Sequence, residues 1–212
     1  MVHLSRDSFL AYFRTEVDTM GPRLSPIERP ANPLLRFAYW IANRQFGKVI
    51  TPLKVIYARK LRLLPIAAQI QRTMEGGLSI DPSLRLLIQV QTSRLNGCSF
   101  CEDLALANAV RNRIGPERFG AMAEFRASTQ FSERERAALA FTEAAVRDRH
   151  VSEEIFAQVR IHFSETELVE LAWVAAAETY FNVQAHALGI GSDELLALAS
   201  ARGHKPHGGF ST

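Results

Sequence analysis

Apolar residues recur at intervals of three and four along nearly the whole chain, the spacing that gathers side chains on one face of an α-helix. Convincing runs of alternating Val, Ile and Thr between turn residues do not occur, so strands are not expected. Two capping-box patterns, Ser132 with Glu135 and Ser164 with Glu167, indicate where helices begin. The sequence therefore predicts an all-α fold, a helical bundle.

Caps and breaks divide this pattern into separate helices. Glycine and proline interrupt it, most clearly in the proline-rich connector at 21–33. The expected helices cover 5–20, 33–46, 52–75, 82–95, 98–113, 116–126, 132–147, a stretch beginning at 152, 164–188 and 193–201. The helix at 164–188 is the most apolar and is expected to pass through the centre of the bundle. We expect residues 1–75 to form an extension packed on a main domain of residues 76–201, followed by a loose tail at 202–212.

Charge and hydropathy exclude several classes of protein. The 25 basic and 22 acidic residues are interspersed, whereas nucleic-acid binding needs basic residues clustered on one face. The most apolar stretch, 168–181, contains Glu170 and Glu178 and is shorter than the roughly 20 residues of a membrane span. Arg6 and Asp7 stand where a secretory signal has its apolar core. A cytoplasmic protein that binds neither nucleic acid nor membrane is expected.

Both cysteines of the chain, Cys98 and Cys101, follow a helix break at Asn96-Gly97 and begin the next helix. Three-residue spacing on a first helical turn suits a reversible disulfide, although free cysteines are often only small buried apolar residues. Helix position alone favours Cys98 as the thiol with the lower pKa. No second CxxC or HxxxH completes a four-ligand zinc site, so no metal is expected, and the tail histidines His204 and His207 are interpreted as solvated.

The stretch "SLRLLIQVQTSRLNGCSFCEDLALANA" resembles the carboxymuconolactone decarboxylase and alkylhydroperoxidase D (AhpD-like) superfamily. The resemblance continues through "FSERERAALAFTEAAVRD" and "YFNVQAHALGI" and covers about residues 81–190. It implies an all-α fold that assembles as trimers or larger oligomers, and a peroxidase that draws electrons from a carrier thiol. It also implies that Cys101 attacks the peroxide, that Cys98 resolves the product, and that their disulfide is the only redox group.

The sequence departs from the pattern that this resemblance implies. Peroxidase members place a histidine four residues after the second cysteine and a glutamate twelve residues before the first. This chain has Ala105 and Leu86 at those positions. A proton acceptor for the thiol must therefore come from elsewhere in the chain.

The candidate acceptor is a polar stripe on the apolar helix at 164–188, formed by Glu178, Asn182 and His186 at intervals of four residues. His186 is the expected base, because its unperturbed pKa near 6.5 is close to neutral pH. Glu178 is expected to orient the base or to act through water, and Asn182 to line the substrate pocket. The alternative is that the stripe lies at a solvent edge or a subunit contact.

Four further charged residues near the cysteines are weaker candidates. Glu102 and Asp103 are interpreted as first-turn acids that favour the positive end of their own helix. Arg94 and Arg85 are considered as cationic partners of the thiols.

Two functional classes remain open, so the sequence does not decide whether the chain is an enzyme. The first is a thiol-dependent oxidoreductase that takes a hydroperoxide or disulfide substrate and electrons from a thiol donor protein. The second is a non-enzymatic AhpD-like oligomer that binds a small apolar ligand, or a decarboxylase-like member without redox activity.

The chain has more large apolar side chains than the core of one 212-residue protein needs, among them Phe37, Trp40 and Ile41. A homo-oligomer is therefore expected, either a trimer or a multiple of a dimer.

Overall fold

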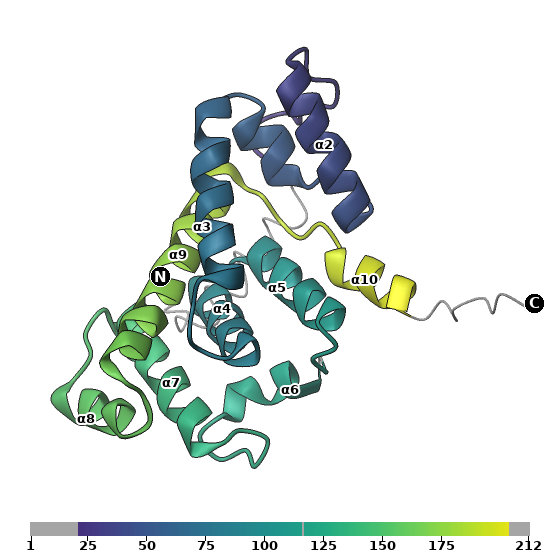
Figure 1. The fold of residues 1–212 in the computed structure, drawn as a ribbon. Coiled ribbons are helices and arrows are strands. Elements are labelled where there is room, and N and C mark those ends of the chain that lie inside the picture. Colours follow the sequence, from purple (N-terminus) through teal and green to yellow (C-terminus); the bar gives the residue numbers. More distant parts are fainter. Residues whose placement is uncertain (1–20, 116, 204–212) are drawn as a thin grey trace, which may run out of the picture.

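The computed structural model describes residues 21–115 and 117–203, and every regular element in this part of the chain is helical. The all-α prediction is confirmed, and Figure 1 shows the arrangement. The α-helices are α2 (Pro33–Phe46), α3 (Leu64–Gly76), α4 (Pro82–Asn96), α5 (Ser99–Arg111), α6 (Glu117–Gly120), α7 (Glu133–Glu143), α8 (Glu153–His162), α9 (Glu165–Leu188) and α10 (Leu195–Gly203). The helix expected at 5–20 and most of the tail expected at 202–212 lie outside the described residues.

Side-chain caps start the helices where the sequence predicts. Ser132 accepts a hydrogen bond from the backbone N–H of Glu135, whose carboxylate accepts one from the backbone N–H of Ser132. Ser164 and Glu167 form the same reciprocal pair at the start of α9. Each pair satisfies two backbone N–H groups that have no partner within the helix. Both predicted capping boxes are confirmed.

The single helix expected over 52–75 is wrong, because the structure divides this stretch into three elements. A π-helical segment covers Leu53–Tyr57, a 3₁₀ turn covers Leu61–Leu63, and α3 begins at Leu64. Pro65 stands in the first turn of α3, where its missing N–H and fixed φ are tolerated, whereas inside a continuous helix it would break a hydrogen bond. Proline therefore begins a new helix here.

Two other expected helices are also divided. The stretch expected over 116–126 is a single turn of α6 followed by a 3₁₀ turn at Ala121–Glu124. The stretch over 132–147 changes from α-helix to a π-helical turn at Ala144–Asp148. These changes leave the order of the helices as predicted.

The centre of the bundle is α4 and not the longer α9, which corrects the expectation from apolar content. Ten of the 15 residues of α4 are buried, against nine of 24 in α9. α4 packs against α5, α7 and α9 (Figure 1). One face of α9 stays exposed, with Val169, Trp173 and Val183 at 70%, 38% and 60% of their full accessibility. None of the described helices is long and apolar enough to cross a membrane.

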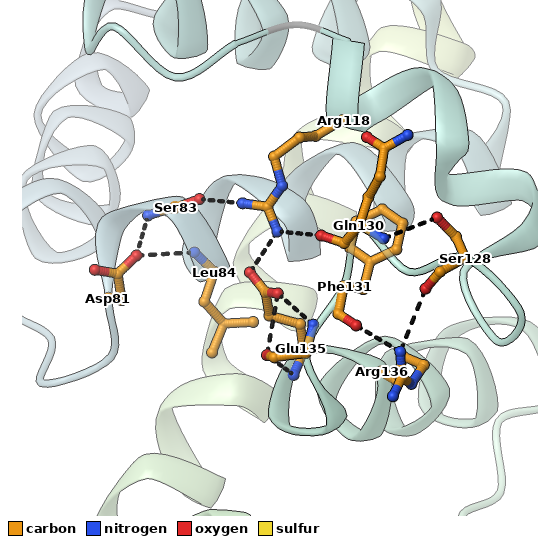
Figure 2. A network of polar contacts seen from close by, with 10 residues as sticks. Asp81, Ser83, Leu84, Arg118, Ser128, Gln130, Phe131, Glu135 and Arg136 are labelled. Carbon is orange, nitrogen blue, oxygen red and sulfur yellow. Dashed lines mark hydrogen bonds and ion pairs between the residues drawn. The ribbon is translucent and has the colours of Figure 1, made fainter.

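Arg118, just inside α6, connects three parts of the bundle, as Figure 2 shows. Its guanidinium donates hydrogen bonds to the Glu135 carboxylate at 2.8 Å, to the Gln130 carbonyl at 3.1 Å and to the Ser83 hydroxyl at 3.3 Å. Ser83 lies in the first turn of α4 and Glu135 in the first turn of α7. The Arg118 side chain thus holds the loop before α7 against the start of α4.

The segment before α3 is attached to the far end of α9 and to the loop before α10. The Arg23 N–H donates to the Leu188 carbonyl at 2.9 Å. The buried Asp193 carboxylate accepts hydrogen bonds from the Thr51 N–H at 2.6 Å and the Thr51 hydroxyl at 2.8 Å, and lies 3.1 Å from the Lys48 ammonium. Val55 of the π-helical segment Leu53–Tyr57 lies in the same apolar cluster as Cys98 and Phe100 at the start of α5.

Candidate thiol site

The two cysteines lie at the junction of α4 and α5. Gly97 adopts a left-handed conformation, with φ at 71°, which ends α4 and turns the chain as the Asn-Gly pair predicts. Cys98 is the N-cap of α5, and its Sγ accepts a hydrogen bond from the Cys101 N–H at 3.4 Å. Both thiols are free and buried, at 3% and 4% of full accessibility. Their spacing on the first turn of a helix is confirmed.

Glu178 is a buried carboxylate beside the Cys101 thiol. It accepts hydrogen bonds from the Gln89 amide at 3.1 Å, the Ser93 hydroxyl at 3.0 Å and the Asn182 amide at 3.2 Å. Burial raises the pKa of Glu178 above its ordinary value, and these donors together with the Cys101 thiol oppose the rise. The raised pKa makes Glu178 a stronger base than an ordinary carboxylate.

The environment of Cys101 keeps its thiol protonated. Burial raises the pKa of Cys101 well above its ordinary value, and the neighbouring Cys98 and the charge on Glu178 raise it further. A hydrogen bond with Asn182 acts in the opposite direction. Since the thiolate is the reactive form, Cys101 needs a nearby group that accepts its proton.

The expected stripe on α9 forms one chain of contacts that leads away from the thiol. Asn182 is fully buried, and its Oδ1 accepts a hydrogen bond from the Asn96 amide at 2.9 Å. Nε2 of His186 lies 2.5 Å from the Asn96 carbonyl oxygen. Glu178 and Asn182 both interact with the Cys101 thiol. The contact of His186 is instead with Asn96, at the end of α4.

The sequence analysis missed the two partners of Glu178 on α4, Gln89 and Ser93. They are four residues apart and face the same way on a buried helix that also contains Leu87, Ile88 and Val90. This spacing was a usable signal, because polar groups on a buried face need polar partners. It would have predicted a polar contact between α4 and a neighbouring helix.

The carboxylates of Glu102 and Asp103, next to Cys101 in sequence, pair with groups other than the two thiols. Oε1 of Glu102 lies 2.9 Å from Nε of Arg94, so these two residues pair with each other. Asp103 was interpreted as favouring the start of its own helix, but its carboxylate accepts the N–H groups of Leu195 and Leu196, both at 2.8 Å. Asp103 thus caps α10, a contact that depends on the packing of α10 against α5 (Figure 1).

The remaining candidates lie away from the thiols. Arg85 donates a hydrogen bond to the Met74 carbonyl at 2.5 Å. Ala105 and Leu86, at the relay positions implied by the family resemblance, are buried together in an apolar cluster that does not include the cysteines. Within 21–115 and 117–203, no three His, Cys, Asp or Glu side chains gather closely enough to hold a metal ion. His204 and His207 lie outside the described residues.

Comparison with known proteins supports the resemblance drawn from the sequence. The family model described as Carboxymuconolactone decarboxylase family matches residues 66–144, a range that includes both cysteines. A peroxidase-related protein from Ralstonia eutropha, solved as an alkylhydroperoxidase AhpD core, superposes with a TM-score of 0.69 at 21% identity, covering 84% of this chain and 96% of its own. Residues 66–144 therefore match the carboxymuconolactone decarboxylase family, and the fold is that of AhpD-like proteins. The prediction from the motif is confirmed.

Two further proteins are similar to this chain. The uncharacterized protein YnjA of Escherichia coli is 27% identical over 140 residues, which are 65% of this chain and 76% of YnjA. The debrominase Bmp8, solved in complex with 2,3,4-tribromopyrrole, superposes with a TM-score of 0.73 at 21% identity, covering 87% of this chain and 99% of its own. At such identities the structural likeness shows the shared fold alone.

Proposed function

We propose that this protein is a thiol-dependent oxidoreductase that reduces hydroperoxides through Cys98 and Cys101. The observation that supports the proposal best is the position of the Glu178 carboxylate beside the Cys101 thiol. In this chemistry Glu178 accepts the thiol proton, replacing the relay that Ala105 and Leu86 lack. His186 acts indirectly, by holding Asn96 and thereby Asn182.

The proposed reaction uses both thiols and balances as follows. Cys101 sulfur attacks the terminal oxygen of the peroxide, the O–O bond breaks, and the leaving oxygen takes the proton to form an alcohol. The resulting sulfenic acid on Cys101 is attacked by Cys98, which releases water and forms the disulfide. A thiol donor protein then returns two electrons and two protons. Two free thiols suit a reducing compartment, and we place the protein in the cytoplasm.

The test is a titration of free thiols before and after one equivalent of cumene hydroperoxide. We expect both thiols to disappear and dithiothreitol to restore them, because the two sulfurs lie on one helical turn. Mass spectrometry should show the loss of two hydrogens within one chain. Predominantly intermolecular disulfides would contradict the proposed pair.

A second candidate function, a ligand-binding protein with structural cysteines, is supported by the near-complete burial of both thiols. It predicts that the thiols stay free after exposure to peroxide. A halogenated substrate is a further alternative, since a dithiol can exchange a carbon–bromine bond for carbon–hydrogen while forming a disulfide and releasing HBr. Release of bromide from 2,3,4-tribromopyrrole, measured with the same protein, separates this reaction from peroxide reduction.

We also propose that the protein forms a homo-oligomer through α2. This helix buries Leu35, Tyr39 and Ala42 on one side. Its other side exposes Leu34, Phe37, Trp40 and Ile41 at 59%, 56%, 57% and 42% of full accessibility. Exposed apolar side chains gathered on one helix face are typical of interfaces between subunits.

Light scattering tests the oligomer. We expect the native protein to exceed the 23.7 kDa of one chain severalfold at micromolar concentration, as a trimer or a multiple of a dimer. Replacing both Phe37 and Trp40 by Glu should yield monomers, because a charged pair cannot be buried without partners. Ile161→Glu, at an exposed site on α8, is the matched control and should leave the mass unchanged. A native monomer would contradict the proposal.

A further inference from the structure

A pocket of about 440 Å³ lies where α3 ends and α4 begins. It is lined from α3, from α4, from the loop that joins them and from α7, by residues that include Met74, Glu75, Leu78, Ile80, Arg85 and Arg134. The pocket lies beside the first turn of α4, whereas the cysteines follow the last residue of that helix. The apolar cluster to which Ile80 belongs contains neither cysteine. The pocket is therefore separate from the thiol site.

Arg85 brings an incompletely paired guanidinium to this pocket. Only 7% of the residue is exposed. Its Nη1 donates a hydrogen bond to the Met74 carbonyl at 2.5 Å, whereas its buried Nε has no hydrogen-bond partner within the described residues. A guanidinium has five N–H donors, and buried arginines are usually paired. Most donors of Arg85 thus lack an acceptor in the described part of the protein.

The other charged groups of the pocket do not supply the missing partner. The Asp81 carboxylate is the N-cap of α4 and accepts two backbone N–H groups of that helix. Glu75 is exposed, and within 21–115 and 117–203 it forms no ion pair with Arg85. Arg134, the second cation, already pairs with Glu167 at 2.6 Å. Arg85 is consequently the group in the pocket with the strongest need for an acceptor.

We propose that this pocket binds a small organic acid, whose carboxylate accepts hydrogen bonds from the Arg85 guanidinium and whose apolar part lies against Leu78 and Ile80. A planar guanidinium matches the two oxygens of a carboxylate, and such charge-assisted hydrogen bonds are stronger than neutral ones. The volume of the pocket and its combination of apolar wall with a few polar groups are typical of small-molecule sites. This binding does not depend on the proposed thiol chemistry.

The experiment measures the binding of benzoate by isothermal titration calorimetry. Benzoate carries one carboxylate on a small apolar ring, and benzamide has nearly the same shape without the charge. The native protein should bind one benzoate per chain. Benzamide should bind at least about tenfold more weakly, because a hydrogen bond that involves an ionised acceptor contributes more.

Arg85→Met tests the guanidinium directly, because methionine keeps an unbranched apolar stem and removes the charge. This variant should bind benzoate at least about tenfold more weakly than the native protein does. Arg72→Met is the matched control. Arg72 is exposed on α3, and its Nε donates to the Ala68 carbonyl of the same helix. Its replacement should change the affinity by less than about twofold, since a distant exposed charge is largely screened.

Glu75→Gln tests the charge of the ligand without disturbing a buried group. Glu75 lines the pocket and is exposed, so the variant should fold as the native protein does. It should bind benzoate about twofold to fivefold more tightly, because the substitution removes a negative charge that repels the carboxylate. Unchanged or weaker binding in Glu75→Gln would contradict a carboxylate beside Arg85.

Three other results would overturn the proposal. The first is a native protein that shows no saturable binding of benzoate below about 10 mM. The second is unchanged binding in an Arg85→Met variant whose circular dichroism spectrum is native, which would place the ligand elsewhere. The third is inorganic phosphate binding as tightly as benzoate, which would indicate a general anion site. None of these measurements involves the thiols, so their failure would leave the proposed function standing.

Discussion

Replacing Cys101 by serine should reduce peroxide consumption to the rate of buffer alone. Cys98→Ser should still allow peroxide to oxidise Cys101 to a sulfenic acid, but should block formation of the disulfide. Glu178 lies beside Cys101, so the proton acceptor serves this thiol. A serine hydroxyl at position 101 cannot replace the thiol, because it is too weakly acidic to give its proton to Glu178. At position 98, serine can still accept the Cys101 N–H and cap α5, so the fold should persist.

The two variants are compared by trapping the product. After one equivalent of hydroperoxide, Cys98→Ser should carry a sulfenic acid on Cys101 that reacts with dimedone, detected by peptide mass spectrometry. Cys101→Ser should carry no adduct. The reverse pattern would assign the attack to Cys98, the thiol that the helix N-terminus favours.

Glu178→Gln should change how the oxidation rate of Cys101 depends on pH. In the native protein the reactive form, with a thiolate and a protonated Glu178, holds as many protons as the resting form, with a thiol and a carboxylate. The proportion of the two forms is therefore independent of pH between the pKa of Glu178 and that of Cys101. The native rate should be level over this interval and fall about tenfold per pH unit below it.

In Glu178→Gln the thiolate forms only by losing its proton to solvent. The oxidation rate should then rise about tenfold per pH unit up to the pKa of Cys101, with no level interval. That pKa should itself be lower, because the substitution removes a negative charge that raises it. Stopped-flow oxidation by cumene hydroperoxide at a series of pH values measures both effects. Identical pH profiles would exclude Glu178 as the proton acceptor.

The control for this substitution is Glu170→Gln on the same helix. Glu170 is also buried, but it accepts the N–H groups of Ser79 and Ile80 at 2.8 to 3.0 Å. Its replacement should affect stability and leave the pH profile unchanged. A flattened or shifted profile in Glu170→Gln would mean that the profile reports general disturbance of α9.

Stability provides a second readout of Glu178. The pKa of Glu178 is raised in the folded protein, so the folded state binds this proton more strongly than the unfolded state. Its contribution to the free energy of unfolding is full below the unfolded pKa and is lost as pH rises through the folded pKa. Glu178→Gln should remove this decline, which urea unfolding at a series of pH values would detect.

Local chain chemistry determined the helical class, the helix starts and the spacing of the thiols. A capping box such as Ser164 with Glu167 involves residues three apart, and the turn at Gly97 needs only a residue that tolerates positive φ. The spacing of four residues between Glu178 and Asn182 on an apolar helix also predicted that they share one face. Each of these features depends on residues that are neighbours along the chain, so the sequence alone contains them.

Tertiary packing decided which helix is central and what surrounds the thiols. α4 is more completely buried than the more apolar α9, because burial depends on how many other helices pack around an element. Asp103 caps α10 from about ninety residues away, and Glu178 accepts hydrogen bonds from Gln89 and Ser93 of α4 across a similar separation in sequence. Such contacts join segments distant in sequence, and their geometry exists only after the intervening helices have packed. The periodicity of one segment shows which face is apolar, but not which distant segment covers it.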